Sequence, residues 1–169
     1  MIEALRTVFA NPSFPSLHVM VVHFPIAFIA FAPLLDIACL VFRDRVWLDR
    51  AAAAMYLLGT LGAGAAYLLG EEAAEAIQTI SPAAESVLAD HEAQAVITLV
   101  VLAVATLIRL MVTWLGRDDR RIKIGIFRLL ALPAAIAALA MLALTADLGG
   151  QLVYHHGVGV NVETSNVER

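Results

Sequence analysis

Hydrophobic positions form four long runs along the chain, separated by shorter polar segments. The runs cover residues 18–42, 51–70, 93–116 and 129–150. An α-helix needs about 20 apolar residues to cross a bilayer, and lipid offers no partners to backbone groups outside helices or closed barrels. Because four segments are too few for a barrel, the pattern predicts an all-α, integral membrane four-helix bundle. We expect one membrane domain over residues 1–160 and a short polar tail at 161–169.

The composition supports a membrane protein. Hydrophobic residues make up 61% of the chain and charged residues 15%, whereas soluble domains average about 45–50% and about 25%. A soluble enzyme of the usual kind, a disordered chain and a disulfide scaffold are therefore excluded. The net charge of −4 and the lack of a basic patch predict no nucleic-acid partner. The lipid bilayer is the expected environment.

Basic residues predict the orientation of the bundle, because they concentrate on the cytoplasmic side of membrane proteins. The segment between the first two runs and the segment between the last two hold most of them: Arg43, Arg45, Arg50, Arg117, Arg120, Arg121, Lys123 and Arg128. The opposite side has only Arg6 and Arg169. We therefore expect both termini and the 71–90 segment on the outer, periplasmic face of a bacterial inner membrane.

This topology brings all five histidines to the outer end. His18 and His23 open the first run, His91 opens the third, and His155 and His156 follow the fourth. Carboxylates reach the same level, among them Glu92 and Asp147. Imidazole binds iron, copper and zinc and also carries protons. The sequence therefore predicts a cluster of ligand-type side chains near the outer surface.

Three interpretations of that cluster remain open. In the first, two histidines bind a b-type haem between the helices, and His18 with His91 match in depth. In the second, a transition-metal ion (iron, copper or zinc) is held by a mixed imidazole and carboxylate set. In the third, the histidines bind no cofactor and the chain is a structural or assembly subunit. The candidate haem residues are His18, His23, His91 and His155, and the candidate metal ligands are His18, His23, His91, Glu92 and Asp147.

Two charged residues lie deep within the runs. Asp36 follows His18 by 18 residues, and Arg109 follows His91 by 18 residues. Since the first and third runs are parallel, both charges should lie about 27 Å below the histidines at 1.5 Å per residue. Charges at that depth find partners inside the bundle, which predicts an Asp36–Arg109 ion pair near the inner boundary. The alternative is that each side chain extends separately to water or headgroups.

Small and helix-terminating residues add local predictions. Gly59, Gly62 and Gly64 in the second run allow close helix approach, either within the bundle or in a homo-oligomer. Between the second and third runs, residues 71–77 and 82–91 look helical, with an N-cap near Ser81. Pro25, Pro33 and Pro133 are expected to distort their helices. No internal repeat is evident in the sequence.

Residues 17–27, Leu-His-Val-Met-Val-Val-His-Phe-Pro-Ile-Ala, resemble the opening signature of the bacterial membrane-protein family catalogued as domain of unknown function 2231. That signature commonly reads Leu-His-Pro, a few apolar residues and His-Phe-Pro-Ile-Ala, and here Val19 replaces the proline. Residues 149–160 resemble the closing motif of the family, and His91 matches a histidine at the start of its third span.

The resemblance implies redox work without a settled activity, because some relatives look fused to Rieske iron–sulfur or cytochrome-like domains. It ranks His18, His23 and His91 ahead of His155 and His156. The expected function is binding of one b-type haem for electron transfer. The chain would then act with other membrane redox subunits and not as a stand-alone enzyme.

Overall fold

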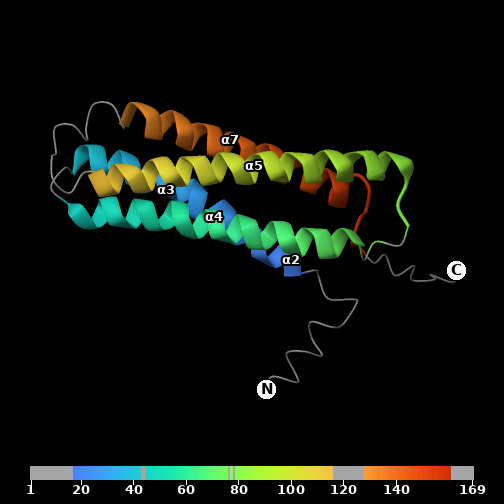
Figure 1. Cartoon of the computed structure of the whole chain (residues 1–169). Helices are drawn as coiled ribbons and strands as arrows, with labels where there is room; N and C mark the ends of the chain where they lie inside the picture. Colours follow the sequence, from blue (N-terminus) through green and yellow to red (C-terminus); the bar gives the residue numbers. More distant parts are fainter. Residues whose placement is uncertain (1–16, 43–44, 76, 78, 116–127, 161–169) are drawn as a thin grey trace, which may run out of the picture.

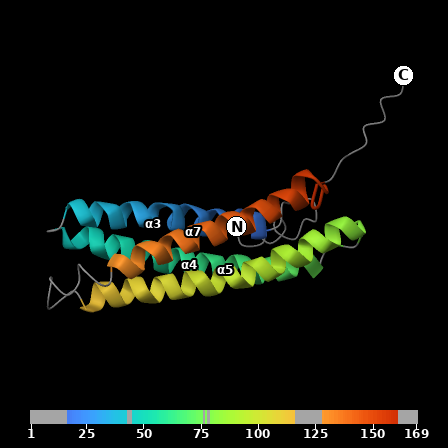
Figure 2. The same cartoon turned by 90° about the horizontal axis from the view of Figure 1, so that it is seen from above.

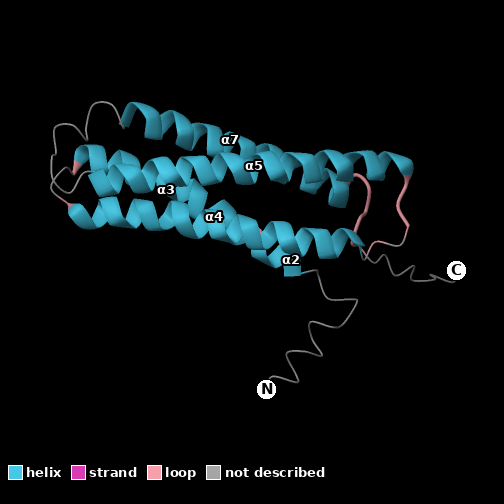
Figure 3. Cartoon of the chain, in the orientation of Figure 1, coloured by secondary structure: helices cyan, strands magenta, loops and turns pink. Residues whose placement is uncertain are grey.

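The computed structural model describes residues 17–42, 45–75, 77, 79–115 and 128–160. Its helices form an elongated bundle (Figure 1) whose elements lie roughly parallel when seen from above (Figure 2). The secondary structure in the described part is helical apart from connecting segments (Figure 3). The helices are α2 (Leu17–Val21), α3 (His23–Val41), α4 (Val46–Glu75), α5 (Pro82–Leu115) and α7 (Arg128–Tyr154).

Four helical segments are long and apolar enough to cross a membrane: Leu17–Val41, Val46–Glu75, Pro82–Trp114 and Leu130–Tyr154. Large apolar side chains cover the outside of the bundle, including Phe31, Leu61, Leu68 and Leu107, each about 60% exposed or more. Such a surface is stable against lipid and not against water. The predicted all-α architecture with four spans is therefore confirmed.

The two central helices are longer than the sequence pattern predicted. At 1.5 Å per residue, the 30 residues of α4 and the 34 residues of α5 extend about 45 Å and about 51 Å, beyond a hydrocarbon core of about 30 Å. Of the stretches expected as short helices at 71–77 and 82–91, residues 71–75 are the last residues of α4, and 82–91 are the start of α5. Apolar runs predict only the part of a helix that lipid would surround, and Glu and Ala, which favour helix, extend α4 and α5 beyond those runs at these ends.

The chain alternates direction, so the bundle has two distinct ends (Figure 1). We call the end with Leu17, residues 79–81 and Val160 the histidine end, and the opposite end the arginine end. The N- and C-terminal ends of the described chain both lie at the histidine end. The side of the membrane that each end faces stays a prediction. Most of the basic residues on which this prediction depends lie outside the described part of the chain: Arg6, Arg43, Arg117, Arg120, Arg121, Lys123 and Arg169. The predicted polar tail at 161–169 lies outside it too.

The helices pack as two hairpins. In the first, α2 and α3 together form the first helix and α4 the second; in the second, α5 packs with α7. The hairpins contact each other chiefly through α4 and α5. The buried core between them is rich in alanine, with a few larger side chains: Ile29, Ala32, Tyr56, Leu102, Ala105, Ala135 and Ala138. Small side chains let helix backbones approach closely, which is how helices associate in lipid.

Two of the three glycines singled out in α4 serve this internal packing. A Cβ atom on Gly59 would lie 2.6 Å from Ile29 Cδ1, and one on Gly62 would lie 3.2 Å from Pro25 Cδ. Gly64, in contrast, has nothing within 4 Å. Gly59 and Gly62 therefore join α3 to α4, and homo-oligomerisation through this helix stays a prediction.

Helix ends follow the local chemistry of the sequence. Ser81 Oγ accepts a hydrogen bond from Ala84 N at 3.2 Å, which confirms the predicted N-cap, and Pro82 takes the first helical position, where no N–H is needed. Pro25 lacks the N–H that would bond to the carbonyl of Val21, and the helix is interrupted at Val22 between α2 and α3. This interruption is the distortion expected from that proline.

Glycine ends the last helix. Gly157 has φ of +66°, a conformation that favours glycine. Its N–H donates to Val153 O at 3.0 Å, and Val158 N donates to Leu152 O at 2.9 Å. The first of these bonds is the bond of the αL C-cap motif, with Gly157 in the left-handed position, so the chain leaves the helix there.

Candidate functional site

Two histidines from different hairpins meet at the histidine end. His18 lies on α2 and His91 lies on α5, nine residues after that helix begins. Their ring centroids are 6.5 Å apart, and their ring planes are almost perpendicular, at 89°. Both side chains are half-buried. The structure thus brings together the two histidines whose depth along the bundle matches.

Each imidazole is held by a backbone carbonyl of a neighbouring helix. His18 Nδ1 lies 2.7 Å from Ala66 O on α4, and His91 Nδ1 lies 3.0 Å from Thr145 O on α7. A carbonyl oxygen only accepts, so Nδ1 must carry the proton in both rings. In a neutral imidazole the other nitrogen, Nε2, then has a free lone pair.

The two Nε2 atoms are available for a ligand. The hydrogen bonds of both rings within the described part of the chain involve Nδ1. No fully buried side-chain nitrogen or oxygen in that part lacks a partner. The unbonded Nε2 atoms therefore keep some accessible surface. Chemically, the arrangement is a pair of oriented imidazoles, each of which can bind a metal ion through the lone pair of Nε2.

A glycine packs against each ring. A Cβ atom on Gly70 would lie 3.0 Å from both Cε1 and Nδ1 of His18, and one on Gly149 would lie 3.3 Å from His91 Cε1. Each glycine follows the carbonyl that accepts the imidazole proton by four residues, or about one helical turn. A larger side chain at either position would therefore press on the ring.

The other candidate residues do not join the pair. His23 is exposed, and its Nδ1 lies 2.8 Å from Val19 O, on the preceding turn of its own chain segment. It follows His18 by five residues, which rotates it about 140° around a helix axis. His155 is exposed in the turn after α7, and His156 is half-buried in the same turn.

The carboxylates of the expected metal set also lie apart. Glu92 is exposed, and exposed Asp147 accepts a hydrogen bond from Gln151 Nε2 at 2.8 Å. Among the residues that the structure describes, no three His, Cys, Asp or Glu side chains are placed to hold a metal ion. The predicted set of His18, His23, His91, Glu92 and Asp147 is therefore reduced to two members.

At the arginine end, the predicted ion pair between α3 and α5 is present. Arg109 is buried, and its Nε donates to Asp36 Oδ1 at 2.6 Å. Its Nη2 donates to Asp49 Oδ1 at 3.0 Å, and its Nη1 donates to Thr113 Oγ1 at 2.7 Å. Tyr56 OH completes the group by donating to Asp36 Oδ2 at 3.0 Å. The guanidinium thus links α3, α4 and α5.

Three members of this group were not predicted from the sequence. Thr113 follows Arg109 by four residues, a spacing that places both on one helix face. Asp49 and Tyr56 lie on α4, whose register against α5 depends on packing. Their sequence positions alone carried no signal that they face Arg109.

The comparisons with known proteins agree with the sequence motifs. Residues 15–162 match the model of a family described as Predicted membrane protein (DUF2231). This chain belongs to the DUF2231 family. No curated protein and no solved structure matches it. The family description supports the membrane location and states no function, so the fold and the geometry carry the functional argument for this DUF2231 protein.

The region that matches the family model includes the two sequence motifs that contribute residues to the site. The opening motif of the DUF2231 chain holds His18, and its closing motif holds Gly149, which packs on His91, and Gly157, which ends α7. The two segments that resembled the family signature therefore supply one imidazole of the pair, the glycine that packs on the other and the adjacent helix end.

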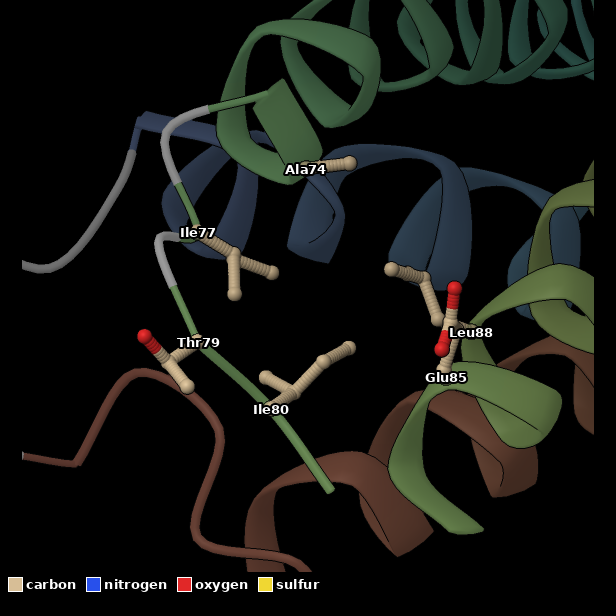
Figure 4. Close-up of a pocket in the computed structure, with 6 residues that line it drawn as sticks. All are labelled: Ala74, Ile77, Thr79, Ile80, Glu85 and Leu88. Atoms are coloured by element: carbon tan, nitrogen blue, oxygen red, sulfur yellow. The ribbon is translucent and has the colours of Figure 1, made fainter. Parts of the chain in front are cut away.

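A hollow also opens at the histidine end of this DUF2231 protein, between the last turn of α4 and the start of α5 (Figure 4). Its volume is about 380 Å³. The side chains that line it are mostly apolar, with one carboxylate: Ala74, Ile77, Thr79, Ile80, Glu85 and Leu88. His18 and His91 are not among them, so the hollow is separate from the imidazole pair.

Proposed function

We propose that this protein binds one b-type haem at the histidine end of the bundle, with His18 and His91 as the two axial ligands, and transfers electrons at the outer face of the membrane. The observation that carries the proposal is the imidazole pair itself. Two rings from different hairpins lie 6.5 Å apart between centroids, each with Nδ1 bonded to a carbonyl. Haem supplies the one-electron chemistry of iron when it is bound.

The number of available ligands favours haem over a bare metal ion. Porphyrin provides four nitrogen donors, so the protein must add only two axial ligands. A protein-bound zinc ion, in contrast, takes three or four protein ligands. Within the described residues no third ligand-type side chain is placed to join His18 and His91. The core of a helix bundle is also an established location for cofactors held by facing helices.

The separation and the hydrogen bonds of the rings also support the proposal. The ring centroids are 6.5 Å apart, so His18 and His91 would both be near enough to hold one haem iron. Ligating histidines usually donate the other ring N–H to a carboxylate or a carbonyl, and Ala66 O and Thr145 O are placed to accept it here.

An absorption spectrum of the purified protein tests the proposal. Wild-type protein expressed with added haem is expected to show a Soret band and a reducible α-band at one haem per chain. His18→Ala and His91→Ala should each lose most of the bound haem, because each removes one axial ligand. His156→Ala, in the turn after α7, is the matched control and should keep it.

The alternatives predict different results in the same experiment. Bound iron, copper or zinc without haem bands would overturn the proposal and support a non-haem metal site. A wild-type protein with neither haem nor metal would overturn it too and support a structural or assembly role. Retention of haem in His18→Ala and in His91→Ala would show that the axial ligands are elsewhere.

The proposed orientation places the histidine end in the periplasm of a bacterial inner membrane, where other redox subunits would exchange electrons with the site. The distribution of basic residues supports it. In a Cys39→Ala background, Glu75→Cys should react with an impermeant thiol reagent in intact spheroplasts, whereas Arg50→Cys should react only after lysis. The reverse pattern would invert the orientation.

A further inference from the structure

We infer that Gly70 and Gly149 are positioning residues, each of which fixes the orientation of one imidazole in the pair. The inference rests on the proposed function only for its effect on haem, because the contacts between the glycines and the rings exist without a cofactor. It assigns a specific role to two residues outside the ligand set.

The same arrangement occurs in both hairpins. In each, an imidazole on the first helix bonds to a carbonyl on the second helix, and a glycine one turn further along the second helix contacts the ring. In the first hairpin these are His18, Ala66 and Gly70, and in the second they are His91, Thr145 and Gly149.

Packing further along the first helix of each hairpin follows the same spacing. Buried residues lie 7, 11 and 14 positions after each histidine: Pro25, Ile29 and Ala32 in α3, and Thr98, Leu102 and Ala105 in α5. The charged residues of the ion pair, Asp36 and Arg109, both lie 18 positions after. Buried positions of the two hairpins therefore lie at matching distances from the two histidines.

The second helix of each hairpin shows matching distances as well. Gly59 and Tyr56 are buried at 7 and 10 positions before Ala66, and Ala138 and Ala135 are buried at the same distances before Thr145. The two glycines follow Ala66 and Thr145 by four residues each, so they lie at equivalent positions beside the two rings.

Each imidazole has two contacts with the neighbouring helix, a hydrogen bond and a glycine, and together they restrain the ring more than the hydrogen bond alone. The hydrogen bond from Nδ1 restrains one atom and still allows the ring to tilt about the bond. Because the glycine has no side chain, the ring lies close to the helix backbone on that side, where a Cβ atom would come within 3.0 Å of His18 or 3.3 Å of His91. An alanine must therefore displace the ring by some tenths of an ångström and weaken its bond to the carbonyl. The interplanar angle of 89° depends on both rings being held.

Four glycine-to-alanine variants test the inference, because the chain offers two matched controls on α4. Gly70→Ala and Gly149→Ala change the contacts with His18 and His91. Gly62→Ala introduces a comparably tight contact, 3.2 Å to Pro25 Cδ, away from both rings. Gly64→Ala introduces a methyl group where nothing lies within 4 Å. Comparison with Gly62→Ala separates loss of positioning from loss of packing.

Nitrogen NMR of protein labelled in its histidine rings provides a readout that needs no haem. In haem-free wild type, His18 and His91 should show the Nδ1-protonated tautomer. Gly70→Ala should shift the ring signals of His18 and leave those of His91, and Gly149→Ala should do the reverse. The two control variants should shift neither pair of signals. Equal spectra for all four variants would overturn the inference.

Binding of added haem b provides the second readout. Gly70→Ala and Gly149→Ala should each raise the dissociation constant about tenfold, the lower range for loss of a group that orients a metal ligand. The electron paramagnetic resonance spectrum of the oxidised protein should also change, since its anisotropy reports the angle between axial imidazole planes. Gly62→Ala should lower the melting temperature and keep the wild-type spectrum.

The outcomes distinguish the two proposals. If the wild type binds no haem, the proposed function fails, and the histidine NMR signals still decide whether the glycines position the rings. If haem binds through His18 and His91 but all four alanine variants match the wild type, the proposed function stands and the glycine inference fails.

Discussion

The polar side chains at the two ends of the bundle differ in how completely the protein supplies their hydrogen-bond partners. At the arginine end, Arg109 donates to Asp36, Asp49 and Thr113, and Tyr56 donates to the other oxygen of Asp36. At the histidine end, His18 and His91 each use one nitrogen for a backbone carbonyl. The polar groups at the arginine end bond to one another, whereas the histidine pair leaves the lone pairs of two Nε2 atoms for a ligand.

This difference separates a structural site from a binding site. A charge in a low-dielectric environment is costly unless partners surround it, and the arginine group meets that requirement with residues of the protein itself. A neutral imidazole with only one of its two nitrogens hydrogen-bonded costs less free energy than a charge without a partner. We therefore expect substitutions at the arginine end to change stability, and substitutions at the histidine pair to change ligand binding.

The largest effect should follow from Arg109→Met. This variant leaves two carboxylates, Asp36 and Asp49, without their buried counter-charge. Breaking a buried ion pair from one side costs about 3–5 kcal/mol. The free energy of unfolding, measured in detergent micelles without haem, should fall by about that amount.

The double variant Asp36→Leu/Arg109→Met is the control for Arg109→Met. It removes one carboxylate together with the guanidinium, and it should recover part of the lost stability, because the two effects of neighbouring groups are not additive. Haem bound per folded chain should stay at the wild-type level. An Arg109→Met protein as stable as the wild type would contradict the assignment of the arginine end as structural.

Depth along the helices was predictable from the sequence, and direction around them was not. His18 with His91, and Asp36 with Arg109, were paired because spans of the same direction place residues with equal spacing at equal height. The same reasoning assigned His23, Glu92 and Asp147 to the histidine end as well. It could not determine which of them face a neighbouring helix, because that depends on how the helices are rotated against one another.

The roles of the glycines beside the rings could not be predicted from the sequence for the same reason. The sequence indicated that Gly59, Gly62 and Gly64 allow close packing, and the structure uses Gly59 and Gly62 in this way. Gly70 stood out only as the end of an apolar run, and Gly149 only as the first residue of the closing family motif. Their contacts with the imidazoles depend on α4 lying beside α2 and α7 lying beside α5.

The smallest effect should follow from His23→Ala, which tests whether direction around the helix decides membership of the site. His23 shares a short segment with His18 and belongs to the motif that resembled the family signature, yet it is exposed and its Nδ1 bonds within its own segment. Exposed substitutions usually change stability by less than about 0.5 kcal/mol. We expect unchanged haem stoichiometry in the absorption spectrum and an unchanged melting temperature. Loss of haem in His23→Ala, with retention in His91→Ala, would mean that the two rings that meet in the structure are not the ligands.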